Sequence, residues 1–229
     1  MKIIKHIVSL SKVALLAFLS AGQVSANTLD PISVEEISRV MQLAAVPNKN
    51  LQARGADLSD GAPSQTPQKL EFLGVKAHRF EKSKQNDGHR WADTLVYDYA
   101  TDELITTVIN LDTNSVISVQ RSREMQPPLS DNELEKAMTI LFEDEEEFSL
   151  LAAEFKQVTG EALISKEQLR YKAFTFFADS MPNIVNEASK ECGAQRCAQI
   201  LAYTTDRISF QYSPIVNLSA GVITQRISY

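Results

Sequence analysis

Two segments of this chain occur twice in the same order, and this internal repeat restricts the possible folds more than any other feature. Val108–Ser118 returns near the C-terminus as Ile215–Thr224, and Pro31–Ile37 returns as Pro128–Leu134. The paired helix-start signals lie 97 residues apart, and the paired Asn-Leu segments lie 107 apart. A spacing of about 100 residues is that of a small domain. The sequence therefore predicts one α+β unit that is built twice.

Each unit is predicted to begin with a helix. Ser33 with Glu36, and Ser130 with Glu133, form capping boxes in which two side chains satisfy backbone donors at a helix start. Pro47 is expected to end the first helix, and Gly160 a helical region of the second unit. Apolar residues follow the capping boxes at helical spacing: Ile37, Val40, Met41 and Ala44, then Leu134, Ala137, Met138 and Leu141, and finally Phe148, Leu151, Ala152 and Phe155.

Antiparallel strands are predicted to follow each helix. Alternating or apolar runs separated by turn signals predict strands at 70–80, 91–99, 104–111, 116–121, 169–177, 198–203, 207–212 and 222–228. A helix followed by about four such strands predicts an α+β unit in which the helix lies across an antiparallel sheet. The repeated Asn-Leu segment is expected in the last hairpin of each unit.

The domain limits follow from these elements. The first unit is predicted at 27–127 and the second at 128–229, with the boundary near Pro127 and Pro128. Residues 48–68 are rich in Asn, Gly, Ser, Asp, Pro and Gln, and this composition predicts a long flexible loop in the first unit.

The first 26 residues are typical of a secretory signal peptide. Lys2, Lys5 and Lys12 precede the short apolar run 13–19, and Val24-Ser25-Ala26 supplies small residues at the spacing of a cleavage site. Cleavage would follow Ala26 and leave Asn27 as the first mature residue. The alternative, an uncleaved anchor, is disfavoured because a membrane span needs about 20 apolar residues. The expected location is therefore periplasmic or secreted, with no membrane span after cleavage.

The charge of the mature chain argues against nucleic acid as a partner. Removal of the three signal lysines lowers the 23 lysines and arginines to 20, against 29 acidic residues, so the net charge becomes −9. An acidic protein repels the phosphate backbone.

The two cysteines, Cys192 and Cys197, are separated by four residues. In an exported protein, such a pair is typical of a structural disulfide. The alternative is a redox-active pair, but redox motifs normally leave two residues between the cysteines.

No residue pattern in the chain predicts catalysis, a bound metal or a cofactor. Only His78 and His89 remain after signal cleavage, too few for a three-histidine site. The acidic run 143–147 lacks the glycine and alternating donors of a calcium loop, so a solvated helix junction is the preferred interpretation. Ser180 could be read as a nucleophile, but no histidine is linked to it by a motif. Trp91 is a candidate surface contact, although a buried strand tryptophan is the more conservative interpretation.

Several segments resemble the copper amine oxidases. The segment 29–37 is similar to the start of that family's second amino-terminal domain. The segments 96–98, 108–112, 116–118 and 126–130 resemble the passage from its second to its third domain. The resemblance implies two small cystatin-like α+β units. In that family, catalysis resides in a large C-terminal domain with three copper-binding histidines and a quinone formed from a tyrosine in an Asn-Tyr motif. This chain contains neither that motif nor those histidines, so the resemblance carries over no catalytic residue.

These observations favour a non-enzymatic exported protein that contacts an unidentified periplasmic protein, for instance by accepting a strand at a sheet edge. Inhibition of a peptidase is a narrower version that rests on fold analogy alone. Two alternatives remain open. One is a small-ligand-binding protein whose cleft between the units is lined by aromatics such as Phe174, Phe176 and Tyr203. The other is an accessory subunit of a separate oxidase.

Overall fold

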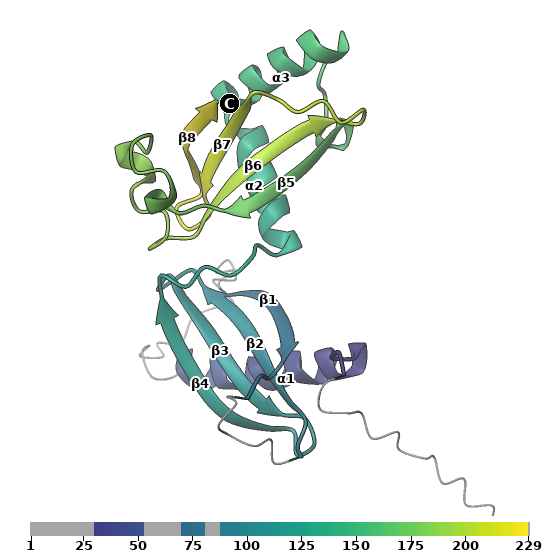
Figure 1. Ribbon diagram of the computed structural model, residues 1–229, viewed down its shortest axis with the longest axis vertical. Helices are drawn as coiled ribbons and strands as arrows, with labels where there is room; N and C mark the ends of the chain where they lie inside the picture. The colour runs from purple at the N-terminus through teal and green to yellow at the C-terminus, as the bar shows by residue number, and fades with distance from the viewer. Residues whose placement is uncertain (1–29, 53–69, 81–87, 229) are drawn as a thin grey trace, which may run out of the picture.

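A computed structural model describes residues 30–52, 70–80 and 88–228 and shows two tandem α+β units (Figure 1). The first unit consists of one helix and four strands: α1 Val34–Gln52, β1 Leu70–Ala77, β2 Trp91–Asp98, β3 Glu103–Asn110 and β4 Ser115–Arg123. The strands form an antiparallel sheet in the order β1-β2-β3-β4. Helix α1 lies across this sheet (Figure 1).

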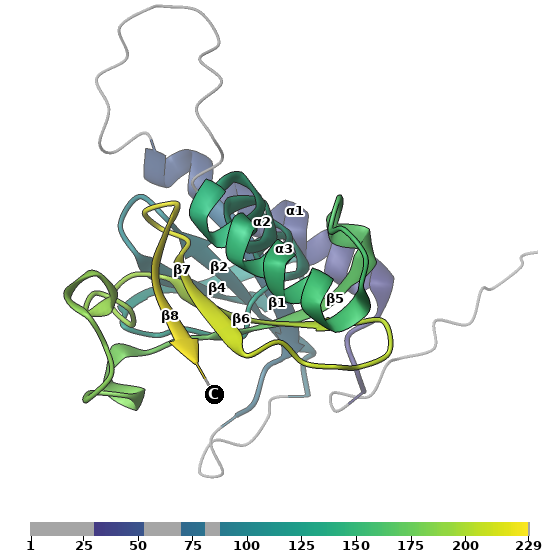
Figure 2. The same ribbon diagram turned by 90° about the horizontal axis from the view of Figure 1, so that it is seen from above.

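The second unit has two helices and a second antiparallel sheet in the order β5-β6-β7-β8. Helices α2 and α3 lie side by side on one face of this sheet (Figure 2). Three short 3-10 helices occur in the connections before and after β5. The elements are α2 Asp131–Glu143, α3 Glu145–Thr159, η1 Lys166–Gln168, β5 Leu169–Thr175, η2 Ala178–Ser180, η3 Glu187–Ser189, β6 Cys197–Thr204, β7 Tyr212–Asn217 and β8 Val222–Ser228. The predicted fold class, two α+β units each with a four-stranded antiparallel sheet, is confirmed.

Each unit has its own core between helix and sheet. In the first unit, Val40 of α1 packs with Ala92, Ile109 and Leu111. In the second, Met138, Leu141 and Phe155 pack with residues of β6 and β7. Val40, Met138, Leu141 and Phe155 all belong to the helix stripes read from the sequence, because residues three or four apart face the same side of a helix. Met41 of the first stripe is an exception and is 44 % exposed.

The structure also repeats in detail. Both last hairpins carry a bulge at the same place, between Val108 and Ile109 in β3 and between Ile215 and Val216 in β7. Directly after these strands, the amide of Leu111 donates to the carbonyl of Arg90, and the amide of Leu218 donates to the carbonyl of Arg196. The repeated Asn-Leu segment therefore lies in the last hairpin of each unit, as the sequence predicts.

A buried arginine–glutamate pair links helix and sheet in both units. The guanidinium of Arg90 donates to both carboxylate oxygens of Glu36 and to the carbonyl of Pro31. In the second unit, Arg196 donates in the same way to Glu133, at 2.7 Å for both bonds, and to the carbonyl of Pro128. Each glutamate is also the last residue of a capping box. The capping-box glutamate thus ties the helix start to the residue before the second strand.

Two sequence predictions about element limits were wrong. Helix α1 continues through Pro47 to Gln52. A proline inside a helix removes one hydrogen bond and costs about 3 kcal/mol, but it does not forbid a further turn. Residues 207–212 do not form a strand: they make one isolated bridge, Tyr203 to Ser209, and β7 begins only at Tyr212. Residues 48–52 of the predicted loop belong to α1, and the rest of that loop, like the predicted signal peptide, lies outside the described residues.

The predicted end at Gly160 is confirmed. Gly160 has a φ of 78° and caps α3 in the left-handed conformation, which favours glycine. Asp144 separates the two helices, because its backbone closes α2 and its side chain accepts from the amide of Glu147 at the start of α3. Within the described residues, no helix is long and apolar enough to cross a membrane.

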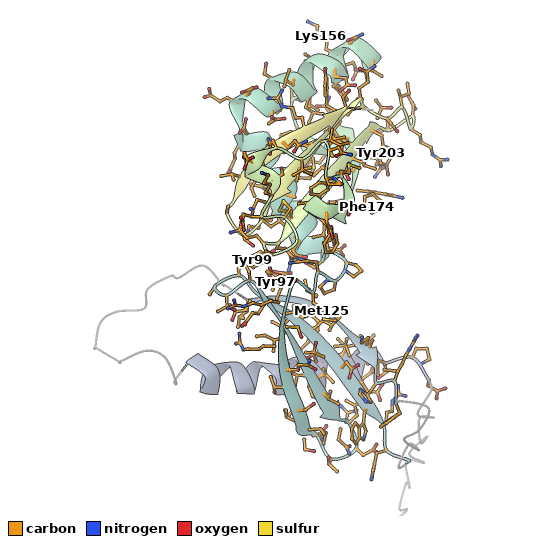
Figure 3. All side chains as sticks on the ribbon, turned by 60° about the vertical axis from the view of Figure 1, so that its left-hand side comes forward. Tyr97, Tyr99, Met125, Lys156, Phe174 and Tyr203 are labelled. Carbon is orange, nitrogen blue, oxygen red and sulfur yellow. A yellow bond between two sulfur atoms is a disulfide. The ribbon has the colours of Figure 1, made fainter. Side chains whose placement is uncertain are left out.

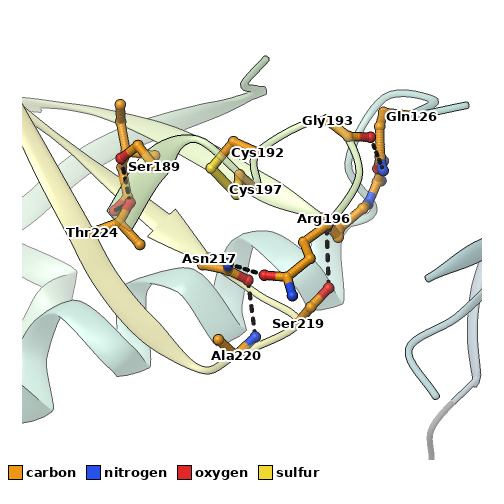
Figure 4. Close-up of a disulfide and its surroundings, with 12 residues drawn as sticks. Gln126, Ser189, Cys192, Gly193, Arg196, Cys197, Asn217, Ser219, Ala220 and Thr224 are labelled. Carbon is orange, nitrogen blue, oxygen red and sulfur yellow. Dashed lines mark hydrogen bonds between the residues drawn. A yellow bond between two sulfur atoms is a disulfide. The ribbon is translucent and has the colours of Figure 1, made fainter. Parts of the chain in front are cut away.

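The two units meet end to end across the linker 126–128. Tyr99 donates to Glu133 at 2.7 Å, and the guanidinium of Arg196 lies 5.2 Å from the ring centre of Tyr97. Gln126 of the linker donates to the carbonyl of Gly193 (Figure 4). Burial raises the pKa of Tyr97 to about 12 and also raises that of Tyr99, so both phenols remain neutral donors. Figure 3 shows both tyrosines where the units meet.

Candidate protein-contact surface

Strand β4 forms an exposed edge of the first sheet. Among the described residues it pairs with β3 alone, and eight of its nine residues are exposed. Its first half carries three apolar side chains, Val116, Ile117 and Val119, which are 39, 47 and 41 % exposed. An edge strand presents unpaired backbone donors and acceptors, and apolar side chains beside them make it a template for pairing with another chain.

Charged contacts fix the second half of β4. Arg121 donates to Asp98 at 3.1 Å and to Glu103 at 2.9 Å, and Arg123 also lies within ion-pair distance of Glu103. The hydrogen bond from Arg121 lowers the pKa of Glu103 below its ordinary value. These contacts hold β4 on β3, so the strand keeps a defined shape although its outer side is exposed.

The corresponding edge of the second unit, β8, is covered. The segment 176–196, which connects β5 to β6, contacts this strand. The side-chain amide of Asn186 donates to the carbonyl of Thr224 at 2.8 Å, and its backbone amide donates to the side-chain carbonyl of Gln225. Ser189 donates to the hydroxyl of Thr224 (Figure 4), and Gln225 donates to the carbonyl of Ile184. Part of the edge of β8 is therefore already occupied within the chain.

The covering segment is anchored by the cysteines. Cys192 and Cys197 form a disulfide with a Cα–Cα distance of 5.4 Å (Figure 4). Both pack with Phe176, Ile215 and Ile227 in a second small core on the sheet face opposite the helices. The disulfide joins the end of the segment to the start of β6, so it holds the segment against the sheet.

The first unit has an aromatic cluster at the equivalent place. The amide of His78 donates to the carbonyl of Trp91, as that of Phe176 donates to Cys197. The ring of Trp91 lies 5.1 Å from that of Phe80 and 5.5 Å from that of His78. His78 Nδ1 lies 2.6 Å from Asp93. Trp91 is half-buried, and its enclosed indole N–H has no hydrogen-bond partner among the described residues.

The other residues singled out by the sequence are not assembled into a site. His89 lies near Asp112, whereas His78 lies near Asp93, and no cluster of possible metal ligands occurs among the described residues. The acidic run 143–147 is a helix junction in which Glu146 and Glu147 pair with Arg226. Of the three aromatics proposed to line a cleft, Phe176 is buried in the second unit, whereas Phe174 is 52 % exposed on β5. Phe174 and Tyr203 both lie away from the meeting point of the units (Figure 3).

The arginines of the buried pairs were not predicted from the sequence. Each stands directly before the second strand of its unit, which is a repeat signal that could have identified them. The difference between the two sheet edges could not be read from the sequence, because it depends on where the segment 176–196 packs.

Comparison with known proteins finds similarity among the solved structures. No family model matches the sequence, and no curated protein is significantly similar to it. A solved structure of a copper-containing benzylamine oxidase from Hansenula polymorpha superimposes with a TM-score of 0.53 at 12 % identity, over 89 % of this chain. This chain covers 30 % of the length of that oxidase. At this identity the similarity shows the fold alone, and it agrees with the resemblance to amine oxidases seen in the sequence.

Proposed function

We propose that this protein is a non-enzymatic exported protein that acts through protein–protein contact, and that a partner adds a strand to the edge of β4. The observation that carries the proposal is the difference between the two units. The edge of β8 is covered by the segment 176–196, whereas its equivalent β4 is exposed over almost its whole length. Strand addition uses backbone hydrogen bonds for affinity and alternate side chains for specificity.

The side chains of β4 define the chemistry of the partner strand. Register with β3 places Val116 and Val119 on the face that carries Ile109 and Thr107, which is the face covered by α1. Arg123 is exposed beyond them. We expect a partner strand with two apolar residues that extend the core over Val116 and Val119, and an acidic residue near Arg123.

In this proposal, the two units correspond to the second and third amino-terminal domains of the copper amine oxidases. Those domains lie outside the catalytic domain, so this correspondence favours a scaffold role. The described residues bring together no metal-ligand cluster. If the binding surface is present in the first unit only, the two copies of the duplicated scaffold have different roles, and only the first unit binds the partner.

Site-specific crosslinking tests the proposal. A photoreactive amino acid at Ile117 in exported protein should give a covalent adduct with a partner, and the same group at Val222 of β8 should not. Val222 is a matched position because it is also an exposed apolar residue on an edge strand.

The partner recovered in this way should protect β4 amides from hydrogen exchange while leaving those of β8 unchanged. Val119→Lys should abolish binding, and Val222→Lys should not. Equal binding by both variants, or turnover of a substrate by the purified protein, would refute the proposal.

A further inference from the structure

The contact between the two units shows how one end of such a unit recognises the other. The head of a unit is defined as the start of its first helix together with its last hairpin turn. The tail is defined as the turn between its second and third strands together with the adjoining end of its first strand. The head of the second unit contacts the tail of the first. Two polar contacts lie at its edges: Ser219 donates to Asp102, and Ser130 and Asn132 both donate to Glu71. At these two positions a neutral side chain of the head meets a carboxylate of the tail, and Lys136 of the same head lies 4.4 Å from the ring centre of Tyr99.

The head of the first unit has the same framework but different charges. Its Arg90–Glu36 pair repeats the Arg196–Glu133 pair of the second head. The repeat spacings place Asp112 at the position of Ser219 and Glu35 at that of Asn132. Both carboxylates are exposed. This head is therefore acidic at the two positions where the second head is neutral.

The tail of the second unit differs at both matching positions. Tyr203 corresponds to Tyr97, and the residue paired with it on the first strand is Arg170, where the first unit has Glu71. The turn that follows ends in Arg207, with a φ of 68°, where the first unit has Asp102, with a φ of 51°. Arg170 and Arg207 are exposed, and neither forms an ion pair within the described part of the chain. This tail is basic where the first tail is acidic.

The two ends are therefore complementary in charge at both positions. We infer that the head of the first unit docks on the tail of the second unit of another copy, in the geometry that already joins the units within one chain. Asp112 would then face Arg207, and Glu35 would face Arg170. Two heads or two tails would place like charges together, so electrostatics favours the head-to-tail contact over its alternatives.

The shape of the molecule determines what this contact builds. The two ends face opposite directions along the long axis: the β3–β4 turn lies at one extreme, and the end of β6 lies beside α3 toward the other (Figure 1). A head-to-tail contact between opposite ends is heterologous, so it propagates into a linear chain of copies unless its rotation closes a ring. This contact does not involve β4, so it is independent of the proposed strand-addition surface.

Sedimentation equilibrium on the mature protein tests the inference. At low salt the average mass should rise with protein concentration, and at high salt it should fall toward that of the monomer, because exposed charges are screened. Glu35→Lys and Arg170→Glu should each weaken association about tenfold. A mixture of the two variants should associate again, because each exchanged charge then meets its opposite. Glu145→Lys, the same change in the first turn of α3, is the matched control and should leave association unchanged.

Circular dichroism of each variant would confirm that it is folded. A monomeric mass at all concentrations and low salt would overturn the inference. Loss of association that the mixture does not restore would also overturn it, as would equal weakening by the Glu145→Lys control.

Discussion

Substitution of Arg196 should separate the stabilities of the two units. The side chain of Arg196 is fully buried and donates five hydrogen bonds, two to Glu133 and three to the linker residues Gln126, Pro127 and Pro128. Arg196→Met leaves the carboxylate of Glu133, itself 1 % exposed, buried without its counter-charge. Removal of one partner of a buried ion pair costs about 3–5 kcal/mol. For a urea dependence of about 2 kcal/mol per molar, the unfolding midpoint should fall by about 2 M.

Urea titrations with two signals can assign this loss to one unit. Trp91 is the single tryptophan and lies in the first unit, so its fluorescence follows that unit, whereas far-ultraviolet circular dichroism follows both. We expect Arg196→Met to shift the circular dichroism transition more than the fluorescence transition. Arg90→Met, the equivalent change in the first unit, should shift the fluorescence transition instead. Glu133→Gln added to Arg196→Met should recover much of the loss, because a neutral amide needs no counter-charge and can still serve the capping box.

A loss of less than about 1 kcal/mol in Arg196→Met, the range of an exposed pair, would contradict a stabilising role of the buried pair. A further loss of stability on adding Glu133→Gln to Arg196→Met would show that the buried charge of Glu133 is not the source of the loss.

Three further predictions follow from the described contacts. The hydrogen bond from Arg90 lowers the pKa of Glu36 in the folded protein. The ionised Glu36 therefore stabilises the first unit above the unfolded pKa, and this stabilisation is lost as pH falls through the folded pKa. Urea midpoints from Trp91 fluorescence should decline in acid, and they should decline less in Glu36→Gln. Reduction of the Cys192–Cys197 disulfide should cost about 2 kcal/mol in thermal unfolding and increase hydrogen exchange in β8, but not in β4. Gly160→Ala forces a side chain into the left-handed region and should cost about 1–2 kcal/mol in urea unfolding, whereas Ala152→Gly in the same helix should cost about 1 kcal/mol.

Local signals in the sequence were sufficient for the elements with their own start and stop residues. The capping boxes at Ser33 and Ser130 and the glycine at 160 define helix ends through contacts within a few residues. The hairpin between β7 and β8 was recognisable because Asn217 serves the turn directly, its side chain accepting from the amide of Ala220 (Figure 4). Contacts of this short range depend only on neighbouring residues, so they can be predicted from a single sequence.

The wrong strand at 207–212 shows where local pattern fails. Ile208, Phe210 and Tyr212 alternate as in a half-buried strand, but only Phe210 is buried, and its ring packs near that of Phe155 in α3. Ile208 and Tyr212 are 50 and 45 % exposed. The apolar residue at 210 is explained by its contact with a helix that is distant in the sequence, and the alternating pattern does not correspond to a strand. In the same way, Arg90 pairs with a glutamate 54 residues away, a distance at which no periodic pattern connects the two residues.

The exposed edge of β4 has charged residues at one end only, and this limits where a partner strand can bind. Natural proteins protect edge strands with charges, bulges or covering segments. In β4, Arg121 and Arg123 protect the second half and the bulge at Ile117 bends the first, whereas β8 has a covering segment in addition to its bulge. The residues 115–119 are thus the part of β4 without a charge, and they contain all three of its exposed apolar side chains. A strand that pairs there would bury those side chains without burying an arginine, so the first half of β4 is the favoured place for strand addition.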